Sequence, residues 1–313
     1  MFNDIKRLKV LYSFYNFFHK KQLIHNVPLF GKWGLRKKYY SSISSKDFKK
    51  LSGTTSGNAE VDQSKLIRGK LFNRLTEVDK QSLISFENNG FAIIKNYLTD
   101  QQADEINEEI TSLLYKKTVS QNNSHKIMFA IHKSELLKNI GNDTDLKELL
   151  SALVNGKVIL FQSINFLMGS QQHTHSDSIH MTTFPLGGLV GVWIALEDIT
   201  EENGPLHYYP GSHKLPYYLN EDYNNEGSRF LLGKKSYKDY EEMIEEKIRS
   251  KSLRKINFLA KKGDLIIWHA NLFHGGNPHL DKSKTRKSMV FHYFKENSIC
   301  YHEITQRPAL LRL

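Results

Sequence analysis

The stretch His173-Thr-His-Ser-Asp177, in the middle of the chain, decides how the rest of the sequence is interpreted. Residues i and i+2 of a strand project from the same face, so His175 and Asp177 can both reach one cation. His274, in Phe273-His-Gly-Gly276, can add a second imidazole. Two histidines and one carboxylate, with positions left open, suit non-haem Fe(II) used in oxygen chemistry. The alternative is a polar pair on a solvated strand edge, because a chain with 14 His offers chance pairs.

A carboxylate-binding pair is predicted further downstream. Arg286 and Ser288 are again two residues apart, and they lead into the strand-like run Met289-Val-Phe-His-Tyr-Phe294. The guanidinium and the hydroxyl can therefore converge on one carboxylate. An Arg fork binds such a group bidentately, with a geometry that Lys cannot copy.

The fold class predicted from the pattern is mainly β with flanking helices (α+β), around a double-stranded β-helix core of the jelly-roll, cupin-like type. From Val158 onward, short apolar runs alternate with Gly, Pro and Asn turns. Helices are expected over residues 76–87, from the capping-box pattern Thr99-Asp-Gln-Gln102 onward, and over residues 237–249.

The run around Trp193 predicts a strand with two different faces. One face is uniformly apolar, whereas the other combines small residues with the indole ring and leaves room for a ligand. The alternative is an ordinary core Trp. The first face holds Val190, Val192, Ile194 and Leu196, and the second holds Leu189, Gly191, Trp193 and Ala195.

Several motifs together resemble the phytanoyl-CoA dioxygenase family of Fe(II)/2-oxoglutarate oxygenases. The resemblance is clearest over residues 169–214 and 262–294 and extends more weakly upstream to about Leu75. The motifs are Gly169-Ser-Gln-Gln-His-Thr-His-Ser-Asp177, Gly191-Val-Trp-Ile-Ala-Leu-Glu-Asp-Ile-Thr200, Asn203-Gly-Pro-Leu206, Pro210-Gly-Ser-His-Lys214, Lys262-Gly-Asp-Leu-Ile-Ile-Trp-His269, His274-Gly-Gly276 and Thr285-Arg-Lys-Ser288.

The resemblance implies a role for each matching residue. It implies that His175, Asp177 and His274 are the iron ligands. It implies that Arg286 and Ser288 bind the distal carboxylate of 2-oxoglutarate. It also implies that Trp193 forms an aromatic wall beside this cosubstrate and that Gln162 makes a polar contact with it. The chain departs from the family pattern at Gly276, where many members carry Ser. His173 shares the strand parity of His175 and is expected to line the cavity or support a ligand.

Composition limits the class of protein. At 313 residues, 39% hydrophobic and 25% charged, the chain suits a globular protein with one sizeable core and an appendage. Its apolar runs are shorter than a membrane span, and the basic N-terminus lacks signal-peptide features. The single Cys300 excludes an internal disulfide framework. A cytoplasmic enzyme is therefore expected.

Charge divides the chain near residue 70. Residues 1–70 hold 15 Lys and Arg against 4 Asp and Glu, whereas the remainder holds 29 of each. This predicts a basic N-terminal arm and linker (1–70) before a dioxygenase domain (71–313). The run Ser52-Gly-Thr-Thr-Ser-Gly-Asn58 indicates a flexible linker.

Residues 1–20 leave two structural interpretations open. Their apolar residues recur at near-helical spacing among Lys and Arg, which predicts an amphipathic helix. This helix either rests weakly on an anionic membrane surface or packs its apolar side on the catalytic domain, and the second interpretation is favoured. Nucleic acid is not expected as a partner, because recognition motifs are absent and the remainder of the chain is electrically balanced.

The predicted activity is hydroxylation of a small-molecule or acyl-type substrate with Fe(II), 2-oxoglutarate and O2, releasing succinate and CO2. Asp177 favours hydroxylation over halogenation, because related halogenases lose the carboxylate ligand to make room for halide. The alternatives are a non-catalytic ligand-binding protein and a jelly-roll metal-binding protein independent of 2-oxoglutarate. The substrate and the oligomeric state cannot be deduced from these residues.

Overall fold

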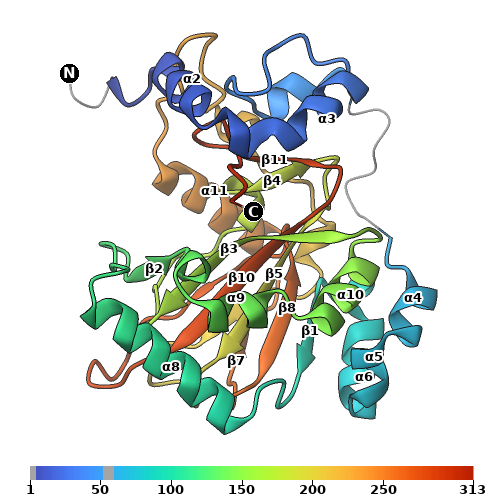
Figure 1. Cartoon of the computed structure of the whole chain (residues 1–313), viewed down its shortest axis with the longest axis vertical. Helices are drawn as coiled ribbons and strands as arrows, with labels where there is room; N and C mark the ends of the chain where they lie inside the picture. The colour runs from blue at the N-terminus through green and yellow to red at the C-terminus, as the bar shows by residue number, and fades with distance from the viewer. Residues whose placement is uncertain (1–4, 52–59, 313) are drawn as a thin grey trace.

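A six-stranded antiparallel sheet forms the centre of the computed structural model, which describes residues 5–51 and 60–312 (Figure 1). Its two longest strands, β3 and β10, pair along almost their whole length. The strand order is β1 (Phe91–Ile94), β8 (Leu265–His269), β5 (Leu189–Ala195), β10 (Ser288–Lys295), β3 (Val158–Phe166) and β2 (Lys126–Met128).

Two three-stranded sheets complete the jelly roll. One has the order β7 (Ile256–Phe258), β6 (Leu206–Tyr208), β9 (His274–Gly276); the other has β12 (Arg307–Pro308), β11 (Ile299–His302), β4 (Thr182–Phe184). Tyr208 and Phe258 of the first small sheet pack with Trp193 and Val290 of the large sheet in one buried cluster. The predicted α+β jelly-roll core is therefore present.

Helices cover the opposite face of the large sheet (Figure 1). The longest begins as predicted, because Thr99 and Gln102 form a reciprocal capping box at its start. Thr76 likewise caps the helix that follows it. The helices after residue 60 are α4 (Gln63–Arg68), α5 (Lys70–Arg74), α6 (Glu77–Ile84), α7 (Phe86–Asn89), α8 (Asp100–Tyr115), α9 (Glu135–Gly141), α10 (Thr144–Leu153) and α11 (Tyr237–Ser250).

The two faces of β5 differ as the sequence predicts. Val192 and Ile194 join the cluster under the helices, whereas Trp193 and Ala195 join the cluster between the sheets. Gly191 lies opposite Trp268 in the β5–β8 register. A Cβ at Gly191 would lie 2.5 Å from the Trp268 ring, so the indole occupies the space that the glycine leaves.

We expect Gly191→Ala to destabilise the protein by about 1–3 kcal/mol, because an added methyl group must displace a buried indole. The measurement is the midpoint of urea unfolding. Gly31→Ala is the matched control, since a Cβ there meets nothing within 4 Å. Equal midpoints for the two variants would contradict the close approach of Gly191 and Trp268.

The N-terminal segment packs on the sheet formed by β4, β11 and β12. Phe48 stacks on Phe184 with ring centroids 4.0 Å apart, and Ser45 Oγ donates a hydrogen bond to the Glu303 carboxylate. Its helices are α2 (Lys9–Phe18), the 3-10 helix η1 (Lys20–Asn26), α3 (Val27–Lys32) and the 3-10 helix η2 (Ser45–Phe48). The boundary near residue 70 stays a prediction, and the predicted linker at 52–58 lies outside the described residues. In the described part of the chain, no helix has both the length and the apolarity needed to cross a membrane.

Candidate metal centre

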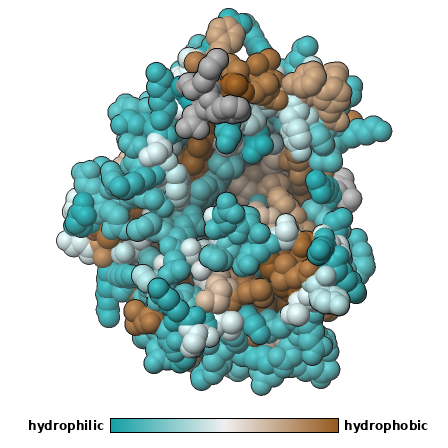
Figure 2. Space-filling model, turned by 90° about the vertical axis from the view of Figure 1, so that its left-hand side faces the viewer, coloured by the Kyte–Doolittle hydropathy of each residue, from teal (hydrophilic) through white to brown (hydrophobic). Residues whose placement is uncertain are grey.

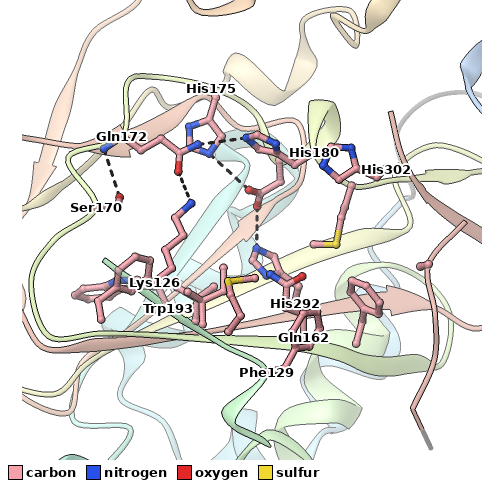
Figure 3. Close-up of a pocket in the computed structure, with 18 of the residues that line it drawn as sticks. Lys126, Phe129, Gln162, Ser170, Gln172, His175, His180, Trp193, His292 and His302 are labelled. Atoms are coloured by element: carbon pink, nitrogen blue, oxygen red, sulfur yellow. Dashed lines mark hydrogen bonds and ion pairs between the residues drawn. The ribbon is translucent and has the colours of Figure 1, made fainter. Parts of the chain in front are cut away.

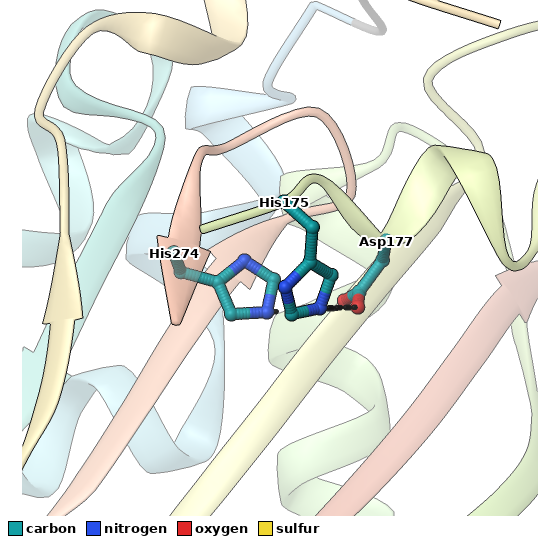
Figure 4. Close-up of side chains that lie close together, drawn as sticks. All are labelled: His175, Asp177 and His274. Atoms are coloured by element: carbon teal, nitrogen blue, oxygen red, sulfur yellow. Dashed lines mark ion pairs between the residues drawn. The ribbon is translucent and has the colours of Figure 1, made fainter. Parts of the chain in front are cut away.

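The structure brings His175, Asp177 and His274 together in one buried cluster (Figure 4). One ligand atom from each lies within 4.8 Å of the other two. Asp177 Oδ1 is 3.9 Å from His175 Nε2 and 3.6 Å from His274 Nε2. These separations allow a single ion between the three atoms, because metal–ligand bonds of about 2.0–2.2 Å are ordinary for these donors.

The backbone positions these ligands differently from the sequence expectation. His175 and His274 form an isolated antiparallel bridge, with N–H to O distances of 2.9 Å in both directions. Asp177 begins a short 3-10 helix, η5 (Asp177–Ile179), instead of continuing a strand. The predicted strand at 173–177 is therefore wrong, although the spacing still places both side chains on one side of the bridge.

Both imidazoles are fixed in the orientation that a metal requires. The Nδ1 atoms of His175 and His274 lie 2.9 Å from the carbonyl oxygens of His173 and Leu272, respectively. A proton on Nδ1 leaves Nε2 unprotonated and directed at the cluster. The side chain of His173 is exposed and contributes no cavity wall, so only its carbonyl supports the site.

Electrostatics favour a neutral His175 and a charged Asp177. Burial, together with His274 and His180, lowers the pKa of His175 well below its ordinary value. Burial alone would raise the pKa of Asp177, but the imidazoles of His274 and His292 hold it well below its usual range. A neutral imidazole and an ionised carboxylate are the forms that bind metal.

Trp268 positions the carboxylate. Its indole N–H donates a 2.7 Å hydrogen bond to Asp177 Oδ2, which leaves Oδ1 directed toward the two histidines. The sequence gives no indication of this contact, because Asp177 and Trp268 lie far apart in the chain.

We expect Trp268→Phe to weaken Fe(II) binding by about 10–100-fold, the usual effect of losing an outer hydrogen-bond partner of a ligand. The variant keeps an aromatic ring and removes the N–H. Anaerobic Fe(II) titration measures the affinity. Trp33→Phe is the matched control, because the Trp33 indole N–H has no hydrogen-bond partner among the described residues. Unchanged affinity in Trp268→Phe would mean that the indole does not orient Asp177.

Arg286 is a buried cation in the cavity wall. Its guanidinium lies over the rings of Phe166 and Trp193 at 5.6 and 5.7 Å, and Nη1 donates to Ser288 Oγ at 3.2 Å. Within residues 5–51 and 60–312, Nε has no hydrogen-bond partner. Burial lowers the pKa of Arg286 to about 10, so the group stays charged at neutral pH. A Cβ on Gly169 would lie 2.7 Å from Nε, so the glycine makes room for the guanidinium.

The triad and Arg286 line the same cavity, which has a volume of about 520 Å³. Trp193 and Gln162 line it as well (Figure 3), and their contact with a cosubstrate stays a prediction. Asp177 is the one carboxylate among the described residues of its wall. An anionic ligand therefore meets positive charge there without competing acidic side chains.

Sequence reasoning missed a second cation beside the metal cluster. Lys126 Nζ donates a 2.8 Å hydrogen bond to Gln172 Oε1 (Figure 3). Gln172 also contacts the Tyr237 hydroxyl, which is 3.0 Å from His180 Nε2. Burial lowers the pKa of Lys126, and that of His180 to about 3. Lys126 comes from the three-residue strand β2, too short to give a sequence signal.

The donor set fits a ferrous ion with a chelating cosubstrate. Two imidazoles and a monodentate carboxylate supply three ligands, and the adjoining cavity leaves the remaining positions accessible. The Arg286 guanidinium, whose Nε has no hydrogen-bond partner among the described residues, then supplies a site for a carboxylate in the same space.

The family model described as phytanoyl-CoA dioxygenase (PhyH) matches residues 86–288, more than half of the chain. This chain belongs to the phytanoyl-CoA dioxygenase family. The predicted family is therefore confirmed.

Individual proteins show the same family likeness. A phytanoyl-CoA dioxygenase domain-containing protein 1 from Danio rerio is 34% identical over 94 residues, which is 28% of this chain and 32% of the relative. An ectoine dioxygenase from Halomonas elongata is 24% identical over 251 residues, covering 73% and 74% of the two chains. The chain spans from about a third to less than two thirds of the first curated relatives that it matches.

Solved structures share the fold. The non-heme alpha-ketoglutarate-dependent carbocyclase SnoK from nogalamycin biosynthesis superposes with a TM-score of 0.59 at 14% identity, covering 73% of this chain and 87% of the carbocyclase. At this identity the likeness supports the predicted jelly-roll fold.

Proposed function

We propose that the chain is an Fe(II)- and 2-oxoglutarate-dependent dioxygenase that hydroxylates a small molecule and releases succinate and CO2. The observation that carries the proposal is the buried Arg286, unpartnered at Nε within the described residues and lining one cavity with the His175, Asp177 and His274 cluster. A jelly-roll metal protein without 2-oxoglutarate has no need of this cation.

Each residue has a defined part in the proposed reaction. His175, Asp177 and His274 would hold Fe(II), and Arg286 with Ser288 would bind the distal carboxylate of 2-oxoglutarate. The bound iron, 2-oxoglutarate and O2 supply the oxidising power that converts a C–H bond to C–OH. The protein would fix the positions of the three ligands and orient the cosubstrate. Trp193 and Gln162 would contact the cosubstrate, because both line the cavity beside Arg286.

The walls of the cavity favour a substrate with an apolar reacting part. Met128, Phe129, Phe161 and Met181 line the cavity together with the triad, so a C–H bond can be held in an apolar environment. Asp177 occupies the position that a halide would need, which supports hydroxylation over halogenation.

Uncoupled turnover tests the proposal. Enzyme loaded anaerobically with Fe(II) is given 2-oxoglutarate and O2, and succinate is measured. We expect slow succinate formation without substrate and faster formation when a metabolite mixture contains the substrate. Absence of succinate under both conditions would favour the non-catalytic or 2-oxoglutarate-independent alternative.

We further propose that the enzyme acts in the cytoplasm, where the Fe(II) and 2-oxoglutarate that this chemistry requires are supplied. We retain the division into a basic N-terminal part (1–70) and a dioxygenase domain (71–313). The charge distribution supports this division. Fluorescence microscopy of the tagged full chain tests the location.

A further inference from the structure

We propose that α2 and the adjoining residues form a docking surface for an anionic lipid bilayer, a property beyond the proposed reaction. α2 is apolar on almost all sides, since Lys9 is its one charged residue. Such a helix is ordinarily buried in a protein core or in lipid. In this structure the rest of the protein covers only one side of α2.

One side of α2 anchors it to the protein. Leu8, just before the helix, forms a β-bridge with Leu231, and the Tyr12 ring lies 5.2 Å from the Arg307 guanidinium. Asn16 is buried and donates a hydrogen bond to the carbonyl of Tyr40. The helix therefore has a defined orientation, and its other side must face outward.

The outward side carries a continuous apolar surface. Phe14 and Phe18 are 63% and 65% exposed, and their ring centroids are 4.8 Å apart. Figure 2 shows apolar atoms gathered at the end of the molecule where the N-terminal helices lie in Figure 1. Contiguous exposed apolar surface is uncommon on soluble monomers and marks contact sites. We call this surface the α2 face; its members are Val10, Leu11, Phe14, Phe17, Phe18 and Ile24.

Positive charge borders the α2 face and identifies the partner. From Ile5 to Lys46, both included, the sequence contains ten Lys and Arg and no Asp or Glu. Lys20 Nζ lies 5.0 Å from the centre of the Phe17 ring, so charge and apolar surface adjoin directly. Apolar side chains that insert, ringed by cations that meet phosphate and carboxylate headgroups, are the features of an interfacial helix on anionic lipid.

The location connects the bilayer to the candidate active site. Tyr15 and Asn16 of α2 line the cavity that holds the triad. Tyr15 is 45% exposed, whereas the metal cluster is buried, so α2 stands at the outer end of the cavity. A lipid-dissolved substrate would therefore enter from the docked side.

Vesicle sedimentation of the full chain, without iron or 2-oxoglutarate, tests the proposal independently of catalysis. We expect about tenfold or more tighter binding to phosphatidylcholine vesicles containing phosphatidylserine than to phosphatidylcholine alone. Joint Phe14→Ser and Phe18→Ser substitution should weaken binding about tenfold or more, because both rings leave the lipid. Joint Lys20→Glu and Lys21→Glu substitution should weaken it at least as much.

Matched variants distinguish docking through the α2 face from nonspecific vesicle binding. Leu280→Ser removes an apolar side chain that is 75% exposed, and joint Lys116→Glu with Lys117→Glu reverses an exposed pair just after α8. Both controls should bind like the unmodified chain. The proposal is overturned if the unmodified chain stays in the supernatant, if the α2 variants bind as well as the controls, or if the Phe substitutions only dissociate a dimer in light scattering.

Discussion

Asp177→Ala is expected to abolish succinate formation and to weaken Fe(II) binding strongly. The loss of affinity should exceed the roughly 10–100-fold loss that follows removal of an outer hydrogen-bond partner of a ligand. The carboxylate is one of three donors, and its Oδ1 lies within 3.9 Å of both Nε2 atoms. Its removal leaves two imidazole ligands, which cannot offset the charge of a divalent ion. Anaerobic Fe(II) titration and a succinate assay measure the two effects.

His173→Ala is the matched control for this prediction. His173 contacts the site through its carbonyl oxygen, and its side chain is exposed. The control should keep iron affinity and turnover, and both variants should retain cooperative unfolding. Full succinate formation by Asp177→Ala would show that the carboxylate is not an iron ligand.

Arg286→Met is expected to raise the KM for 2-oxoglutarate by about 30-fold to several thousand-fold, the range for removing one partner of a buried hydrogen-bonded charge pair. The same change should leave the ligand-free protein equally stable or more stable. Without a ligand, this buried guanidinium forms no salt bridge within the described residues and its Nε has no hydrogen-bond partner there, so its burial is costly. Steady-state kinetics and urea unfolding give the two readouts.

A loss of cosubstrate affinity without a loss of stability distinguishes a binding role of Arg286 from a structural role. A structural Arg would lose stability and cosubstrate affinity together. Lys287→Ala is the matched control, since it removes a neighbouring cation that is only half-buried and should change neither value. An unchanged KM in Arg286→Met would contradict its assignment as the carboxylate anchor.

The parts of the fold set by local chemistry were predictable from the sequence. The capping box at Thr99 predicts the start of α8, and the alternation around Trp193 predicts which residues of β5 share a face. Helix α11 also follows its apolar spacing over Tyr240 and Ile244. In each case the signal lies within one turn of helix or a few residues of strand.

The features that the sequence left open depend on long-range contacts. The bridge between His175 and His274 replaces a predicted strand, because the partner lies about a hundred residues away. The Trp268 contact with Asp177 and the placement of Lys126 also join distant segments. The packing of residues 1–20 was also left open: Leu8 and Tyr12 contact the body of the protein, whereas Phe14 and Phe18 remain exposed.

Absorption spectroscopy under anaerobic conditions tests the central claim most directly. Fe(II) is added to the protein, followed by 2-oxoglutarate, and the metal-to-ligand absorption of a keto-acid chelate is recorded. We predict that this band appears in the unmodified protein and is lost in Asp177→Ala. We also predict that Arg286→Met shifts its appearance to much higher 2-oxoglutarate concentration. A spectrum that never develops the band at saturating 2-oxoglutarate would contradict the account.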